Sequence, residues 1–438
     1  MAGTIIQSES LKDTFVSNFR PVKLNGNGHL SPLQQKGEKA LAESSLPTRK
    51  WEEWKYTSLQ NIYEGTFLPS STSGEIDITS HLIPGLEADI LVFHNGEFQS
   101  ELSNISTEKK VTISTLKELD NDSKAFYEEH SGQFLSVDKN VFSALNASYA
   151  KEGVLVHVSA SATKEKPLFV LHLFSGASDS AYSASQHRNL IWVERNAEVN
   201  IVEKYVNLGE GKTFHNQTTE IFVGDDARCK LTRFQEGARQ GSSVEQTQVH
   251  IGKNANFTIS TLSFGGELVR NNLEIFLDGE HSEAHLFGTY MHAGLQHVDN
   301  HTKVHHKVPN CFSNELYKGI IHDKGTAVFN GRINVYQDAQ KTNAFQSNRN
   351  ILLSPTANIF TKPQLEIYAD DVKCSHGATT GQLDTDAMFY LKARGINETE
   401  ARMLLIQAFV GEVTENLSIE AVQTYANELI ANRFTPST

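Results

Sequence analysis

Cysteine is scarce in this chain, which has three among 438 residues, at Cys229, Cys311 and Cys374. Their odd number and wide spacing exclude a disulfide framework and favour a reducing compartment, so the sequence predicts a cytoplasmic protein. No CxxC pair occurs, and three thiolates are too few for a four-thiolate cluster site within one chain.

Long apolar runs, a leader and an excess of positive charge are also missing. No apolar run approaches the roughly 18–20 residues that span a bilayer. Met1–Ser10 lacks the basic segment and apolar core of a secretory signal. Lys and Arg number 39 against 52 Asp and Glu, a formal charge of −13, which argues against a general nucleic-acid binder. We therefore expect neither a membrane nor a nucleic-acid partner.

Signatures of nucleotide binding and hydrolysis are missing too. The sequence contains no GxxxxGK[ST], GxSxG or HExxH, so it indicates no such activity of its own. The chain is long enough for two or three domains with a sizeable core.

The region 1–152 begins with helical patterns. Apolar residues recur at helical spacing within Leu11–Phe19. Ser31 is a suitable N-cap and Gln34 can complete a capping box, which predicts a second helix to about Glu43.

The rest of this region is mixed. Trp51 and Trp54 are three apart, so they can share a helical face in a small aromatic core. Asp89–Phe93 is strand-like, and helices are expected around Ile113–Leu119 and Lys139–Lys151.

Across 153–380, short apolar strands alternate with polar turns, and a degenerate repeat recurs: a polar turn, a small residue, any residue, and a small or apolar one. The last members of these triplets are Val199, Cys229, Phe257, Ala284, Val328 and Ile359. Their intervals are 30, 28, 27, 44 and 31 residues. A spacing near 30 in strand-rich sequence predicts a β-helix, whose coils bury apolar faces by stacking. The interval of 44 suggests an insertion or an extra partial coil.

A histidine-rich stretch lies within that longest interval. Its potential metal ligands are His292, His297, His301, His305, His306, Cys311 and His322. A metal site needs three or four ligands to converge without a competing charge, and Lys303 and Lys307 are such competitors. A polar strand surface, facing another chain, is the favoured interpretation, and whether His305, His306 or Cys311 contacts iron stays open.

The region 381–438 is helical. Asp384 can cap a helix from about Thr385 to Arg394 that Gly395 closes, and Asn397 can cap a second. Ser418 can cap a third helix. The second helix has two apolar stripes: Ala401, Leu404, Leu405 and Ala408, and Met403, Ile406, Val410, Val413 and Leu417. So short a tail can hardly bury both, so we interpret it as a docking module.

The stretch Asp370–Gly381 lies between the strands and the helical tail and contains Cys374 and His376. In an extended chain, residues two apart project from the same face. A thiol and an imidazole presented together can bind a soft or borderline metal. On chemistry alone, a buried cysteine beside a satisfied histidine at the end of a strand is the favoured interpretation.

Two other classes fit a β-helix. One is an enzyme acting on polysaccharides, but the chain shows neither an export signal nor a paired-carboxylate constellation. The other is an interaction solenoid with no chemistry of its own.

Several long motifs resemble the SufB/SufD family, the β-helical subunits of the SUF iron–sulfur cluster assembly machinery. They are Asp370–Gly381, Phe389–Gly395, Tyr317–Gly319, Phe329–Gly331, Asp338–Gln340, Gln346–Ser354 and, near the N-terminus, Glu52–Thr57. The resemblance is strongest from about Asn300 to Leu417, and the few cysteines favour the SufD side of the family.

The resemblance implies a right-handed parallel β-helix (153–380) between N-terminal (1–152) and C-terminal (381–438) helical domains. It implies a non-catalytic scaffold that pairs with SufB and binds two copies of the ATPase SufC, which supplies the ATP dependence. The family's cluster-assembly histidine matches His376, and the adjacent cysteine matches Cys374. No cofactor is expected to be tightly bound, and iron or a nascent cluster is held transiently with SufB.

The C-terminal helices of the family bind SufC. Candidate docking residues are Met403, Ile406, Val410, Val413, Phe389 and Tyr390. The sequence leaves open whether the isolated chain forms a homodimer, whether the complex binds flavin, and which cluster type is built.

Overall fold

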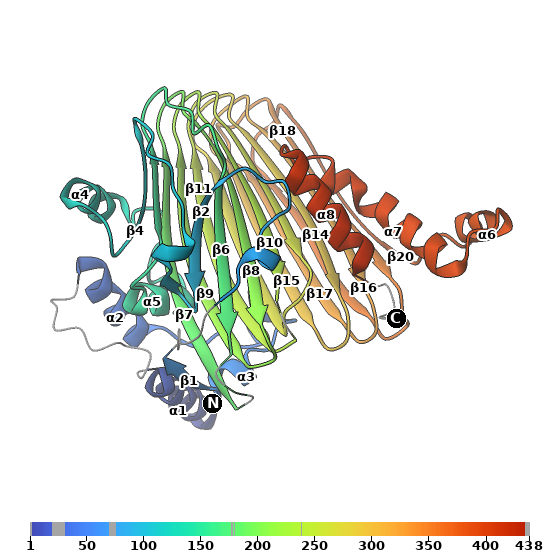
Figure 1. Cartoon of the computed structure of the whole chain (residues 1–438), viewed down its shortest axis with the longest axis horizontal. Helices are drawn as coiled ribbons and strands as arrows, with labels where there is room; N and C mark the ends of the chain where they lie inside the picture. The colour runs from blue at the N-terminus through green and yellow to red at the C-terminus, as the bar shows by residue number, and fades with distance from the viewer. Residues whose placement is uncertain are drawn as a thin grey trace.

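The computed structural model describes residues 2–19, 31–69, 76–176, 178, 180–237 and 239–433. Its body is a parallel β-helix in which successive strands alternate between two ten-stranded sheets (Figure 1). The first sheet contains β1 (Thr66–Pro69), β4 (Val111–Thr115), β5 (Val154–Val158), β7 (Ala181–Val193), β9 (Thr213–Val223), β11 (Gly241–Ile251), β13 (Leu268–Leu277), β15 (His297–His306), β17 (Thr326–Val335) and β19 (Asn358–Ile367). The second sheet contains β3 (Glu97–Phe98), β2 (Asp89–His94), β6 (Leu168–Ser175), β8 (Glu198–Leu208), β10 (Arg228–Glu236), β12 (Asn256–Ser263), β14 (Glu283–His292), β16 (Phe312–Ile321), β18 (Thr342–Leu352) and β20 (Val372–Gly381). The predicted parallel β-helix flanked by helices is confirmed.

The repeat in the sequence arises from the turns that lead from the first sheet into the second. Asn196, Asp226 and Asn254 occupy three of these turns with φ of 56°, 58° and 55°. Asn and Asp accept this left-handed conformation more readily than other non-glycine residues. Each is followed by an alanine that is buried between the sheets, because only a small side chain fits at this bend of the coil.

The expectation of an insertion in the interval of 44 residues is wrong. Thr289 and Lys318 are neighbours in the second sheet within this region and are 29 residues apart, an ordinary coil. Ala284 lies on β14 of the second sheet, whereas Val328 lies on β17 of the first. The interval therefore joins two different turns of the coil, because both kinds of turn are followed by a small residue.

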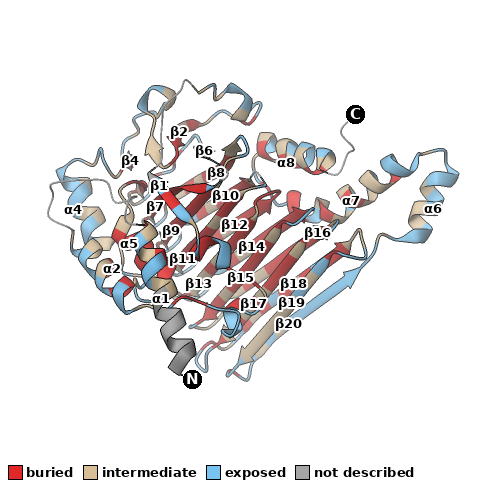
Figure 2. Cartoon of the chain, turned by 90° about the horizontal axis from the view of Figure 1, so that it is seen from below, coloured by how far each residue is buried: buried red, intermediate tan, exposed pale blue. Residues whose placement is uncertain are grey.

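Helices from the N-terminal part cover the outer face of the first sheet near its beginning (Figure 2). These elements are α1 (Ala2–Phe19), α2 (Pro32–Glu43), η2 (Glu52–Trp54), α3 (Gln60–Tyr63) and α5 (Val141–Tyr149). Their buried residues pack with Tyr182, Phe214 and Val244 of the sheet. The short elements η3 (Thr79–His81), η4 (Ser100–Leu102) and α4 (Asn121–His130) complete this part.

Some of the local predictions for this part are confirmed and one is wrong. The capping box of Ser31 and Gln34 is confirmed, as are the helices predicted within Leu11–Phe19 and Lys139–Lys151. The helix expected around Ile113–Leu119 is wrong, because β4 occupies its start and pairs with β5.

The two tryptophans do not share a buried face. Trp54 is buried and stacks its ring under the Arg270 guanidinium, whereas Trp51 is exposed. The turn that contains them is a single 3₁₀ turn, too short to align both rings.

Two C-terminal helices, α7 (Glu398–Thr414) and α8 (Glu420–Asn432), lie across the outer face of the second sheet (Figure 1). The preceding helix, α6 (Thr385–Ala393), projects beyond the sheet. Asp384 and Asn397 cap α6 and α7 as predicted. The predicted cap at Ser418 is wrong, because α8 begins after Ile419 and has no side-chain cap.

Strands β1 to β4 come from the first 152 residues and belong to the same two sheets as the solenoid. The division at 152/153 and 380/381 therefore stays a prediction. Over the described ranges, no helix combines the length and apolar character needed to cross a bilayer.

Candidate metal site at the open end of the solenoid

The solenoid ends in two strands that each pair on one side only within the described structure. These are β19 in the first sheet and β20 in the second, each ten residues long. Figure 2 shows β20 exposed along its length. Unpaired backbone N–H and C=O groups along such strands are a template for pairing with another chain.

Cys374 and His376 lie on β20, so the prediction that this stretch is extended is confirmed. Cys374 packs partly against the core between the sheets, and its register partner is the buried Ala344. Alternation along the strand places His376 on the same inward face, one step nearer the middle of β20. The pair therefore faces the lumen of the solenoid at its open end.

The two candidate ligands differ in exposure. Cys374 is half-buried, and burial raises the pKa of its thiol above the usual value. His376 is exposed. The imidazole is thus the more accessible donor, and the thiol must lose its proton before it can act as a metal ligand.

On the two strands that precede β20 in the second sheet, polar residues occupy the register position of His376. Gln346 of β18 pairs with His376, and Glu315 of β16 pairs with Gln346. Their side chains are almost fully buried, and Gln346 Nε2 donates to Glu315 Oε2 at 2.7 Å. Sequence reasoning missed both, because their intervals to His376 are informative only once the register is known.

The side chains of the histidine-rich stretch contact different partners. Its members have separate environments: His301 contacts Asp299, His305 contacts Glu274, and His306 contacts Ser313 Oγ. Throughout the described ranges, no group of three or more His, Cys, Asp or Glu side chains has a geometry that would hold a metal ion. The interpretation of this stretch as a polar strand surface is wrong for most of its members, because His292, His301, His305 and His306 are buried.

Cys311 is buried beside Ser282 Oγ at 3.3 Å, facing the core. His292 is fully buried, and burial lowers its pKa well below the usual value. Cys311 directly precedes β16 and His292 ends β14, so neither residue is on the terminal strands β19 and β20.

The docking residues predicted on α7 need correction. Ile406, Val410 and Val413 are 2%, 1% and 0% exposed, because this stripe packs against α8 and the outer face of the second sheet. They hold the helical module on the solenoid and do not present a surface to a partner. The tail does not bury this stripe by itself, because the outer face of the second sheet covers part of it.

An apolar surface does remain on the projecting part of the module. Phe389 and Tyr390 of α6 are 74% and 58% exposed, and Leu404 of the other α7 stripe is 45% exposed. Met403 is half-buried between the two faces. Large apolar side chains this exposed in a group are typical of a protein interaction site.

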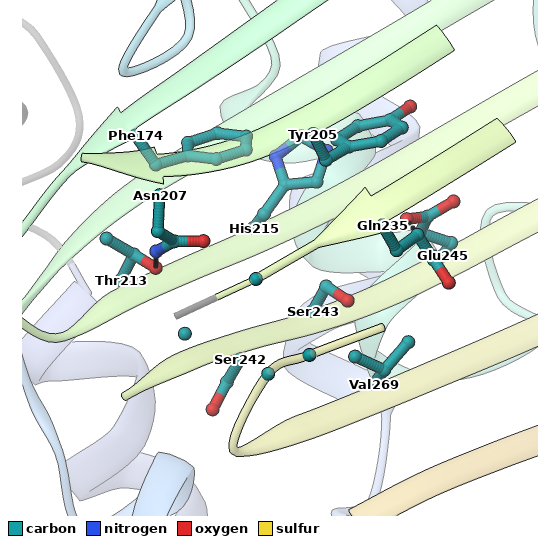
Figure 3. Close-up of a pocket in the computed structure, with 14 residues that line it drawn as sticks. Phe174, Tyr205, Asn207, Thr213, His215, Gln235, Ser242, Ser243, Glu245 and Val269 are labelled. Atoms are coloured by element: carbon teal, nitrogen blue, oxygen red, sulfur yellow. Dashed lines mark hydrogen bonds between the residues drawn. The ribbon is translucent and has the colours of Figure 1, made fainter. Parts of the chain in front are cut away.

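A small cavity lies elsewhere in the lumen, nearer the beginning of the solenoid (Figure 3). Its volume is about 30 Å³, and its walls include Tyr205, His215 and Glu245. Burial holds the pKa of His215 well below its usual value, so this imidazole is neutral. The cavity does not include Cys374 or His376 and belongs to a separate buried polar network.

Together these features define a class of protein. It is a solenoid scaffold with two soft or borderline metal ligands on a terminal strand, followed by a helix that exposes apolar side chains. Comparison with known proteins gives the family. The model described as SUF system FeS cluster assembly, SufBD core domain, matches residues 174–409, and the SufBD N-terminal region matches residues 7–170. The chain belongs to the SufBD family of iron–sulfur cluster assembly proteins.

Several relatives match about nine-tenths of the chain. It is 32% identical to iron–sulfur cluster assembly protein SufD of Escherichia coli, over 92% of this chain and 93% of that protein. It is also 32% identical to a SufBD family protein of Synechocystis, over 90% and 88% of the two chains. The chloroplastic protein ABCI7 of Arabidopsis thaliana is 29% identical over 91% and 84%.

Proposed function

We propose that this chain is a non-catalytic scaffold subunit of a SUF iron–sulfur cluster assembly complex. In this proposal its open end pairs with SufB, its projecting helix binds the ATPase SufC, and His376 helps to hold iron or a nascent cluster at the shared edge. The observation that carries the proposal is the location of Cys374 and His376 on the unpaired strand β20.

Pairing with a second β-helix is supported by the geometry of the end. Both β19 and β20 are long, parallel to their inner neighbours and unpaired on the outer side. A partner with the same two-sheet cross-section would continue both sheets at once and satisfy both rows of backbone groups. Exposed Ile367 and Tyr368, at 40% and 65%, lie at the end of β19 and would be covered.

The number of ligands supports a shared site. A tetrahedral iron centre takes four donors, and this end of the solenoid offers one thiol and one imidazole. The remaining donors would come from SufB and from sulfide. Because His376 is exposed and Cys374 is half-buried, His376 is the principal ligand in this proposal and Cys374 an accessory.

The exposed face of α6 supports a role in binding SufC. In the proposed cycle, ATP binding draws two SufC copies together, the attached helical modules move, and the SufB–SufD-type interface opens to admit iron. Because α7 is packed on β14 and β16 of the second sheet, a movement of the module would be transmitted to these two strands.

Co-purification tests the assembly. The full chain is co-expressed with SufB and SufC and captured through a tag on SufC. Phe389→Ser is expected to release this chain from SufC, whereas Tyr368→Asp is expected to weaken its pairing with SufB, each with an unchanged circular dichroism spectrum. Leu295→Ser, which removes an exposed apolar side chain from the turn between β14 and β15, is the matched control. Retention of both partners by both variants would contradict the proposed surfaces.

A homodimer is the competing occupant of the open end. Analytical ultracentrifugation of the isolated chain distinguishes the two cases, because Tyr368→Asp would dissociate a homodimer in the absence of SufB. A homodimer that persists when SufB is added in excess would contradict pairing with SufB.

A further inference from the structure

Along the second sheet, the side chains in register with His376 change from apolar to polar close to the open end. In the second sheet, the register position that ends at His376 is occupied on successive strands by Ile201, Leu231, Ile259, Leu286, Glu315 and Gln346. The first four are buried aliphatic side chains, as a solenoid core requires. The last two are polar, although they are 1% and 3% exposed. Burying a polar group is unfavourable unless it is hydrogen-bonded, so these two residues need a reason.

Part of that reason is the bond between them. Gln346 Nε2 donates to Glu315 Oε2 at 2.7 Å, which fixes the orientation of the amide. The amide oxygen, Gln346 Oε1, is also buried, but it has no hydrogen-bond partner among the described residues. One acceptor is therefore left unsatisfied one strand below the open end.

The opposite sheet makes room for this amide. Gly331 of β17 faces Gln346, and a Cβ at that position would lie 2.2 Å from Gln346 Nε2. A side chain at position 331 would displace the amide from its bond to Glu315. The position of Gln346 is thus determined from two sides, by a carboxyl group and by a glycine.

The residue in register with Gln346 on the next strand is His376. Neighbouring strands lie about 4.8 Å apart, so an imidazole on one is within hydrogen-bonding reach of an amide on the next. A histidine that binds a metal through one ring nitrogen characteristically donates from the other to a carbonyl or carboxylate oxygen, which fixes its tautomer and orientation.

We propose that Gln346 is a positioning residue for His376: its Oε1 accepts a hydrogen bond from one ring N–H, and Glu315 anchors the amide from below. The other ring nitrogen is then the one presented to the metal ion. The proposal rests on the ligand role of His376 proposed above, and it assigns the two buried polar residues a function that packing alone does not explain.

The first measurement follows the tautomer of His376 in the full chain. Long-range ¹H–¹⁵N spectra of histidine-labelled protein report which ring nitrogen carries the proton, and loss of a signal in His376→Ala identifies the residue. Wild type is expected to show one predominant tautomer, whereas Gln346→Leu and Glu315→Leu are expected to show a mixture. Glu315→Gln keeps an acceptor for Gln346 Nε2 and is expected to restore the wild-type spectrum.

The matched control is Asn348→Leu. Asn348 lies on the same strand, faces the same lumen and is equally buried, but it is hydrogen-bonded to Tyr290 Oη and Tyr317 O and is in register with Ala378. It is expected to loosen the core without changing the His376 tautomer. An unchanged tautomer in Gln346→Leu, or an equal change in Asn348→Leu, would overturn the proposal.

The second measurement is the affinity of the assembled complex for Co²⁺, followed by its absorption bands. Loss of an outer hydrogen-bond partner typically lowers metal affinity 10–100-fold, so Gln346→Leu is expected to raise the Kd for Co²⁺ within that range. If His376→Ala leaves Co²⁺ binding unchanged, the ligand role fails, whereas the tautomer result still decides the positioning role. If His376→Ala weakens binding and Gln346→Leu does not, the positioning role fails alone.

Discussion

Glu315 gives the most quantitative prediction. It is fully buried, and burial raises the pKa of its carboxyl from 4.5 to about 7. A group whose pKa is raised on folding contributes stability below its unfolded pKa, and that contribution is lost as the pH rises through the folded pKa. Ionisation of Glu315 therefore destabilises the fold progressively between about pH 4.5 and pH 7.

The magnitude follows from the shift. A tenfold change in an acid dissociation constant corresponds to about 1.4 kcal/mol, so raising the pKa from 4.5 to about 7 costs about 3 kcal/mol when fully expressed. Part of this stability is already lost at pH 5, so the loss between pH 5 and pH 8 is about 2–3 kcal/mol. Glu315→Gln removes the ionisation but keeps an oxygen that accepts from Gln346 Nε2. The variant should therefore gain this amount relative to wild type when the pH is raised from 5 to 8.

The assay is urea denaturation followed by circular dichroism, at pH 5 and pH 8, for wild type and variant. The quantity of interest is the change with pH in the difference between the two free energies of unfolding, because other titrating groups cancel. Glu118→Gln, at an exposed position, is the control and is expected to retain the wild-type pH dependence. A difference between Glu315→Gln and wild type that is the same at both pH values would refute the account of Glu315 as a buried acid.

Three further predictions concern the core and the helical module. Arg233 is buried between Glu203 and Glu245, with nitrogen–oxygen distances of 2.7 and 2.8 Å. Arg233→Leu leaves two buried carboxylates without their cation and should lower the free energy of unfolding by about 3–5 kcal/mol. A loss below 1 kcal/mol, measured by urea denaturation, would show that these charged groups are solvated. Gly331→Ala should displace the Gln346 amide, lower the free energy of unfolding by about 1–3 kcal/mol and give the same mixture of His376 tautomers as Gln346→Leu. A wild-type spectrum would show that Gln346 keeps its contact with His376 in the variant. Ile406→Asp places a charge in the apolar cluster beneath α7, so it should lower the Tm and increase proteolysis of residues 381–433. Leu404→Asp, on the exposed stripe, should change neither. Equal Tm values for the two variants would mean that α7 is not packed on the sheet.

Much of the fold could be predicted from the sequence because its signals are local. The turn residue with positive φ and the small residue after it recur once per coil, so spacing alone indicated a solenoid. Ser31 with Gln34, and Asp384 and Asn397, satisfy helix ends within a few residues, and those helices begin where predicted.

The errors arose where the sequence pattern is the same for two different arrangements. A small residue follows the turn on both sides of the coil, which made one ordinary coil and a half resemble an insertion. The apolar stripe of Ile406, Val410 and Val413 marks a buried face, but periodicity does not say whether the sheet of the same chain or a partner buries it. Only the packing of α7 on the second sheet decides this.

The candidate site was predictable in part. Cys374 and His376 are two residues apart on one strand, so their shared face follows from alternation alone. Gln346 and Glu315 are distant in sequence, and their alignment under His376 depends on the strand register. A single polar residue within each coil carries no such information until the coils are stacked.

The central claim is that His376 holds iron or a nascent cluster at an edge completed by another chain. The most direct measurement is the iron and sulfide content of the complex with SufB and SufC, isolated intact with wild-type chain, His376→Ala and His322→Ala. His322 is a surface histidine paired with Asp323, so its substitution controls for loss of an imidazole elsewhere. The account predicts that iron and sulfide fall several-fold in His376→Ala alone while the subunit ratio stays the same. Wild-type iron and sulfide in an intact His376→Ala complex would contradict it.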